Sequence, residues 1–163
     1  MKVAEKDKWK PKSFRSIEEL RDELSTIENA HNAGTLSTYG GWTPGQCMAH
    51  CAQFMGHSFD GFKMKMPWLM QLMGKLFIKR MLTKPNAQMK PGFKLPASAA
   101  SMRPSDEVSV EEGLAMMNKQ VVRLEAGEKM NQDSPFLGSM NHDLWVALHL
   151  NHCRMHFGFF KYD

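Results

Sequence analysis

Three of the seven histidines in this 163-residue chain, and one of its three cysteines, lie within the eight residues 149–156. On a helix that turns about 100° per residue, His149 and His156 share the centre of the apolar face, with His152 and Cys153 on either side of it. Each neutral imidazole has one donor and one acceptor to satisfy, and burying these without partners is costly. A divalent metal ion takes up several lone pairs at once, so the cluster indicates a metal site. Buried or surface histidines with protein partners are the alternative.

A further candidate ligand, His50, lies on a second predicted helix. Thr43, Pro44 and Gln46 form a capping-box start for this helix, which we expect to run to about Phe62. His50 lies at the margin of its apolar stripe, a position that suits a ligand in an interhelical pocket and equally suits a surface histidine. We expect surface or capping roles for the other three histidines, His31, His57 and His142.

Capping signals predict the helices that position these residues. Long amphipathic helices are predicted to begin after Ser16, Thr43, Ser109 and Asn141. A short apolar helix is predicted over 67–82, and the prolines of 85–101 predict an irregular loop. No strand pattern is present. Four long helices with a long crossover between the second and third predict an all-α, four-helix bundle in one domain, 1–163, with a loose arm over 1–15 and a crossover over 63–105.

Basic residues are concentrated in the predicted crossover. The net charge is +4, yet nine Lys or Arg and no Asp or Glu lie between Asp60 and Asp106, leaving 12 basic and 17 acidic residues elsewhere. This stretch can be a solvated cover over the bundle, a positive rim that draws an anionic substrate to the metal, or a contact with a membrane surface or nucleic acid. Nucleic acid is disfavoured because no recognised binding motif is present.

Cysteine usage and the apolar runs bear on the compartment. An odd, small number of cysteines argues against a disulfide framework and favours a reducing, cytoplasmic location. Cys47 and Cys51, four residues apart, are expected to be buried apolar residues. The N-terminus has no apolar run typical of a signal peptide, and no stretch is apolar enough to predict a membrane span.

Four segments resemble the DinB/YfiT-like superfamily, and are most similar to one of its uncharacterised branches. They are Trp42-Thr43-Pro44-Gly45-Gln46 with His50, and the stretches 91–96, 134–138 and 149–154. The resemblance implies a four-helix bundle that binds a divalent metal, most often nickel or zinc, through three histidines. One ligand comes from the second helix and two come from the fourth, as His-x-x-x-His followed by Arg. Several members are thiol S-transferases or hydrolases, and many form homodimers.

Carried onto this chain, the resemblance implies His50 and His149 as ligands, with the third at Cys153. A cysteine there departs from the family pattern. Either Cys153 ligates as a thiolate, or His152 replaces it, or the pair shifts to His152 and His156, or the site has decayed. All these pairs have the i+3 or i+4 spacing that lets two helical side chains meet one ion.

The sequence and the resemblance together predict a divalent-metal-dependent enzyme, a thiol S-transferase or a small-molecule hydrolase. The expected partner is a small molecule such as a low-molecular-weight thiol, with no nucleic acid and no membrane span. The alternative is a non-catalytic helical bundle with a structural or vestigial metal site. Three protein ligands with an open position favour catalysis, and four favour structure. Helical geometry points Arg154 away from the cluster, so we expect it in a structural or dimer-contact role. No catalytic residue is identified.

Overall fold

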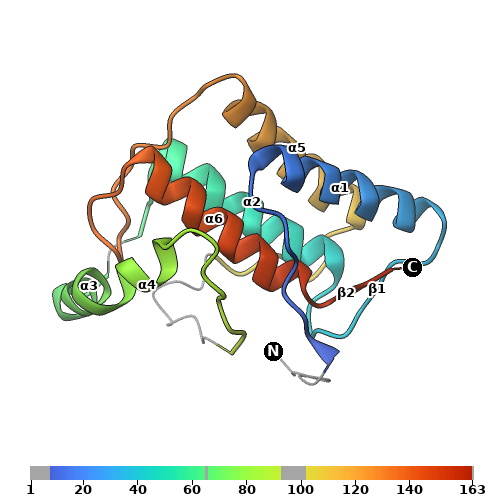
Figure 1. Ribbon diagram of the computed structural model, residues 1–163, viewed down its shortest axis with the longest axis horizontal. Coiled ribbons are helices and arrows are strands. Elements are labelled where there is room, and N and C mark those ends of the chain that lie inside the picture. Colours follow the sequence, from blue (N-terminus) through green and yellow to red (C-terminus); the bar gives the residue numbers. More distant parts are fainter. Residues whose placement is uncertain (1–7, 65, 93–101, 163) are drawn as a thin grey trace.

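A computed structural model describes residues 8–64, 66–92 and 102–162 of the protein. Within these ranges the chain is mostly helical, which confirms the predicted all-α class (Figure 1). The long helices are α1 (Ile17–Asn32), α2 (Pro44–Asp60), α5 (Val110–Glu125) and α6 (His142–Phe157). α2 packs between α5 and α6, and α1 packs on α5. None of the helices in the described ranges is long and apolar enough to cross a membrane.

Each long helix begins at its predicted cap because the cap side chain accepts the hydrogen bond of a backbone N–H three residues on. These caps are Ser16, Thr43, Ser109 and Asn141. α2 ends at Asp60, two residues before the predicted end, where Gly61 adopts a φ of 97°. The caps are local interactions, so the sequence pattern was sufficient to predict them.

The last long helix is followed by a strand that was not predicted. α6 ends at Phe157, and β2 (Phe160–Lys161) pairs antiparallel with β1 (Ser37–Thr38). At Gly158 the chain is crowded by the N-terminal arm, because a Cβ there would lie 2.5 Å from the carbonyl oxygen of Lys10. Strands of two residues are too short to show an alternating pattern in the sequence.

The N-terminal arm was predicted to be loose, and over residues 8–15 this prediction is wrong. The indole N–H of Trp9 donates to the Met155 carbonyl at 2.9 Å, and Phe14 is buried in the core. Lys12 forms a 3.2 Å ion pair with Glu23 of α1. These contacts connect residues far apart in the sequence, so composition could not reveal them. Residues 1–7 lie outside the described ranges.

The crossover holds the predicted short apolar helix, but in three pieces. α3 (Trp68–Met73) continues into a π-helical segment, η2 (Gly74–Ile78), and then into α4 (Lys79–Thr83). The wider π turn begins at Gly74, where the helix backbone lies so close to the Phe136 carbonyl that no Cβ would fit. The predicted irregular loop has no helix or strand over 85–92, and 93–101 lies outside the described residues.

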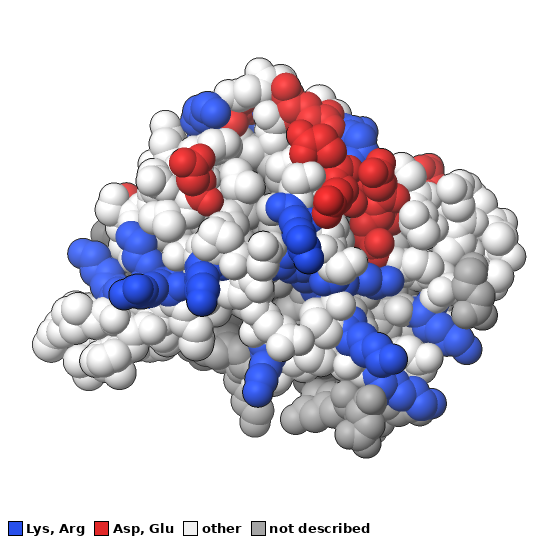
Figure 2. All heavy atoms as spheres, viewed as in Figure 1, with Lys and Arg blue, Asp and Glu red and all other residues white. Residues whose placement is uncertain are grey.

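Charge is unevenly distributed over the surface. Figure 2 shows acidic side chains gathered over α1, and basic side chains over the lower half of the same view, where Figure 1 places the crossover and the two chain ends. The asymmetry in the sequence therefore becomes an asymmetry in space, which long-range electrostatic attraction can use.

Candidate metal centre

Three imidazoles from two antiparallel helices meet between α2 and α6. His50 of α2 and His152 and His156 of α6 each offer a ring nitrogen, and these three nitrogens all lie within 4.8 Å of one another. The side chains are buried, with exposed fractions of 5%, 8% and 7%. His152 and His156 are four residues apart, so one helical turn brings both rings to the same face. No other potential metal-binding group of three or more His, Cys, Asp or Glu is found among the described residues.

The ring of His50 is oriented by the crossover. Its Nδ1 lies 2.6 Å from the backbone carbonyl oxygen of Met102. A carbonyl oxygen can only accept, so Nδ1 carries the hydrogen and the lone pair of the neutral ring is on Nε2. A hydrogen bond from the second ring nitrogen to a backbone carbonyl is the usual support of a histidine that ligates a metal.

The two α6 rings face each other through like atoms. The Nε2 atoms of His152 and His156 are 3.1 Å apart, so they share one hydrogen or both face a cation. Two nitrogens on a tetrahedral zinc ion are separated by about 3.3 Å, given a bond length near 2.05 Å. The Nδ1 of His152 is buried and has no hydrogen-bond partner among the described residues. A ligand from outside the chain can satisfy such an atom.

Burial keeps these imidazoles neutral. Loss of hydration lowers the pKa of His50, and it lowers the pKa of His152 and His156 well below the ordinary value. Charge on a neighbouring imidazole lowers the pKa of the two α6 rings further. Only a neutral imidazole can donate a lone pair to a metal, so the environment favours the ligating form at neutral pH.

Aromatic side chains enclose the three rings. Trp42 stacks on His156, with ring centres 5.7 Å apart and planes 8° from parallel, and it meets the ring of His50 edge-on at 5.1 Å. Phe54 meets His152 edge-on at 5.3 Å. Trp42 and Phe54 were not predicted to be parts of the site. Their positions could have indicated this role, because Trp42 lies directly before the cap of α2 and Phe54 lies one helical turn after His50.

His149 belongs to a separate buried pair. Its Nε2 lies 3.0 Å from the Ser58 hydroxyl, which itself donates to the Met55 carbonyl at 2.6 Å. Because Ser58 has only one hydrogen to donate, His149 is the donor in their bond and its neutral ring holds the lone pair on Nδ1. Burial lowers the pKa of His149 to about 3. The ligand pair that the resemblance implies, His50 with His149, is therefore not the pair that the structure brings together.

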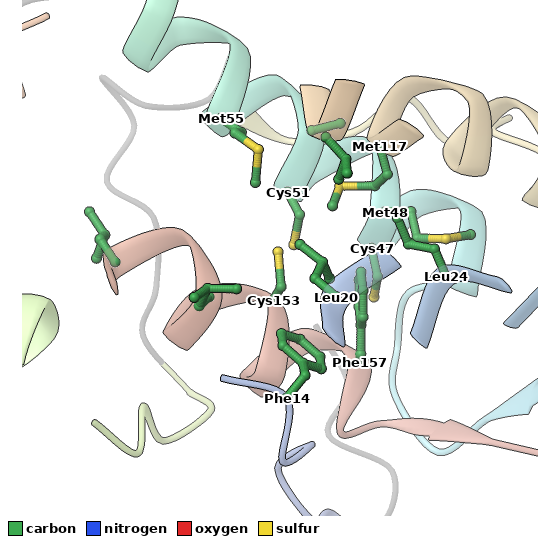
Figure 3. Packing of buried hydrophobic residues seen from close by; sticks show 14 of the residues in the cluster. Phe14, Leu20, Leu24, Cys47, Met48, Cys51, Met55, Met117, Cys153 and Phe157 are labelled. Atoms are coloured by element: carbon green, nitrogen blue, oxygen red, sulfur yellow. The ribbon is translucent and has the colours of Figure 1, made fainter. Parts of the chain in front are cut away.

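Cys153 faces away from the three-histidine group. It is buried in the hydrophobic core, where it hydrogen-bonds to Cys51, and Figure 3 shows the two sulfur atoms pointing toward each other. Burial raises the pKa of the Cys51 thiol well above its ordinary value and that of Cys47 to about 12. Cys47 and Cys51 are buried core residues, as predicted.

Arg154 also lies apart from the centre, in the structural setting predicted for it. Its guanidinium donates to the Phe14 carbonyl at 2.9 Å and to the Asn86 side chain at 3.0 Å. These bonds join the N-terminal arm and the loop after α4 to α6. The other histidines have the predicted surface or capping contacts. His31 pairs with Glu111 on the surface, His57 contacts the end of its own helix, and His142 accepts from the Met130 N–H.

A cavity of about 330 Å³ lies between the end of α2 and the crossover, and none of the three histidines lines it. Met102 lines this cavity and also holds the ring of His50. Gln53, which lines it too, has a buried side-chain oxygen without a hydrogen-bond partner among the described residues. Its remaining lining residues are His57, Phe62, Lys63 and Met64. The volume suits a small molecule, and Lys63 adds a positive charge to the wall.

Comparisons with known proteins give a family but no described activity. A family model described as "Protein of unknown function (DUF1569)" matches residues 9–163. No curated protein and no solved structure matches the chain. The match covers all three histidines of the centre, Trp42, Phe54 and the whole crossover. The chain belongs to the DUF1569 family.

Proposed function

We propose that this protein is a divalent-metal protein whose ligands are His50, His152 and His156. The observation that carries the proposal is the convergence of three buried ring nitrogens from two helices within 4.8 Å. The Met102 carbonyl that orients His50 supports it, because a ligating histidine usually donates its second ring N–H to such a carbonyl. An all-imidazole donor set suits zinc and nickel, which are the metals we propose.

The proposed fold relationship is with the DinB/YfiT-like bundles. α2 supplies one histidine and α6 supplies two at i,i+4 spacing, which resembles the ligand distribution of that superfamily. The α6 pair is displaced along the helix, from positions 149 and 153 to positions 152 and 156. A homodimer is part of the same proposal, and light scattering coupled to size exclusion tests it.

The proposed activity is transfer of a small thiol, or hydrolysis of a small bond, in the cavity beside Met102. Three protein ligands leave a coordination position open, and a divalent metal there lowers the pKa of a water or thiol. This chain's own contribution is to bind and orient. Gln53 offers an unpartnered acceptor, and Lys63 attracts the carboxylate that many small thiols carry. Trp42 and Phe54 exclude water from the rings.

One observation favours a non-catalytic binding protein as the second candidate. Each of the three rings has an exposed fraction of 8% or less, so an ion held by them has little direct access to solvent. A centre closed in this way is typical of a structural site. In that case the cavity holds a ligand without transforming it.

A paired experiment separates these functions. Untagged protein is analysed for metals, then assayed with monochlorobimane and several thiols, with zinc, nickel or manganese added. We expect about one ion per chain and turnover with at least one thiol, both lost in His50→Ala and retained in His31→Ala, a surface control. Turnover should fall as salt rises, because salt screens attraction by exposed lysines. Bound metal without turnover favours the binding protein, and no metal binding contradicts the whole proposal.

A further inference from the structure

The exposed apolar side chains of this protein are concentrated in one segment of the crossover. Within the described residues, seven of the eight exposed large hydrophobic side chains lie between positions 68 and 81, and the eighth is Val122 on α5. The exposed fraction is 74% for Trp68 and 65% for Phe77. A large apolar patch on a folded protein marks a surface that meets a partner or a membrane. The seven residues are Trp68, Leu69, Leu72, Met73, Leu76, Phe77 and Met81.

The spacing of these seven residues produces a continuous row along α3, η2 and α4. They follow one another at intervals of one, three or four residues, so they share one side of the helical segment. Figure 1 shows α3 and α4 projecting at one end of the long helices, and Figure 2 shows a mostly uncharged lobe at the same place. The row is therefore presented outward.

The opposite side of the segment is anchored to the rest of the protein. The Gly74 backbone lies against the Phe136 carbonyl, and the Lys79 ammonium donates to the Ser139 carbonyl. The Asn151 side chain of α6 donates to the carbonyls of Leu82 and Lys84, at 2.7 and 3.0 Å, where α4 ends. These contacts satisfy the end of the helix and fix its orientation, so the row is held away from the core.

The charge beside the row is entirely positive. Lys75, Lys79, Arg80 and Lys84 lie in or next to the segment, and no acidic residue occurs between Asp60 and Asp106. Figure 2 shows basic side chains gathered along the edge of the uncharged lobe. A second copy docked face to face would bring two such basic segments together without compensating charge, which is unfavourable. A surface with dense negative charge and an apolar interior complements both features.

We propose that the segment 68–83 binds the surface of an anionic lipid bilayer. The apolar row inserts at the boundary between head groups and acyl chains, and the lysines and arginine lie at the level of the lipid phosphates. Tryptophan and phenylalanine suit this interfacial layer. The segment would lie in the plane of the membrane, because none of the helices in the described ranges is long and apolar enough to cross it. The protein is thus a peripheral binder, whether or not its metal centre is catalytic.

Vesicle co-sedimentation of the full chain tests this proposal. We expect the protein to pellet with vesicles that contain phosphatidylglycerol, and to bind pure phosphatidylcholine at least about tenfold more weakly. The combined change Trp68→Ser, Leu72→Ser and Phe77→Ser should lower binding by at least about tenfold, since it removes three large apolar groups. Val122→Ser, the matched exposed apolar residue on another helix, should bind like the parent. So should His50→Ala, which separates this test from that of the metal centre.

Further measurements show whether the triple variant is folded and whether the row is a dimer interface. Circular dichroism and thermal melting report whether the triple variant is folded. If it is not, Arg80→Gln combined with Lys84→Gln replaces it, and this pair should weaken binding and reduce its dependence on salt. Absence of binding by the parent to anionic vesicles would overturn the proposal. So would a parent dimer that the triple variant converts to a monomer without any vesicle binding, because the row would then be an interface between two copies.

Discussion

The buried group of His50, His152 and His156 and the separate buried histidine His149 lie about one turn of α6 apart, and their surroundings differ. The rings of His152 and His156 face each other and His50, so their neighbours are the ring nitrogens of other histidines. The ring of His149 faces the hydroxyl oxygen of Ser58, to which its Nε2 is hydrogen-bonded. All four rings are nearly inaccessible, and burial lowers the pKa of each. Burial alone therefore does not distinguish a ligand from a structural histidine.

What distinguishes a ligand histidine from a structural one is which ring nitrogens have a hydrogen-bond partner. Ser58 gives its hydrogen to a backbone carbonyl and accepts one from the Nε2 of His149, so no lone pair is left between these two side chains. The Nδ1 of His149 has no hydrogen-bond partner among the described residues, but it belongs to no group of converging ligand atoms there. In the other group the Met102 carbonyl takes the hydrogen of His50, which leaves the lone pair of the neutral ring on Nε2. Nitrogen lone pairs that converge on one point need a hydrogen or a cation between them, and one cation can satisfy all three rings at once.

Metal affinity should show the largest difference between the two groups. Replacing His50, His152 or His156 by Ala should weaken zinc or nickel binding by about 100-fold or more, the upper end of what loss of a supporting residue costs. His149→Ala should change the affinity by no more than a few fold, on the order of one weak interaction. Isothermal titration of metal-free protein measures both. If His149→Ala and His156→Ala lost metal affinity equally, the assignment of His156 as a ligand and His149 as a structural histidine would be wrong.

Acid should destabilise the metal-free protein, and His149 should contribute a measurable part. Its pKa is about 3 in the folded protein and ordinary, near 6.5, in the unfolded chain. Between these values only the unfolded chain binds the proton. This stabilising contribution is thus complete above about pH 6.5 and is lost toward pH 3, by roughly 1.4 kcal/mol per pH unit. Urea unfolding from pH 7 to 5 should show a smaller slope with pH in His149→Gln. An unchanged slope would mean that folding does not lower the pKa of His149.

The smallest effect is expected at Ser58. Ser58→Ala leaves the buried N–H of His149 without an acceptor, which should lower the free energy of unfolding by about 1–3 kcal/mol. Ser25→Ala is the matched control, because its hydroxyl bonds a backbone carbonyl in the same way on an exposed surface. We expect that control to stay within about 0.5 kcal/mol of the parent. Chemical denaturation measures both, and a loss of metal affinity in Ser58→Ala would show that the two groups are coupled.

The sequence alone determined the features that depend on near neighbours. The caps at Ser16, Thr43, Ser109 and Asn141 are local, and the structure has all of them. Four of the five candidate ligands were also identifiable, because histidine and cysteine at i+3 and i+4 spacing form a pattern on one helix, and His50 stood out on a second predicted helix. Three of the five converge, and the other two, His149 and Cys153, are neighbours of that group with other partners.

Only the tertiary structure decided which candidates meet. Cys153 lies to one side of the centre of the predicted apolar face of α6, and packing turns it toward Cys51 in the core. The same orientation of α6 places His152 and His156 opposite His50. If α6 were rotated about its own axis by a few tens of degrees, another set of candidate ligands would face His50. No local interaction fixes this rotation, because it depends on how the two helices pack. The same holds for Met102, which is 52 residues from His50 in the chain and orients its ring through a contact that only the folded crossover brings about.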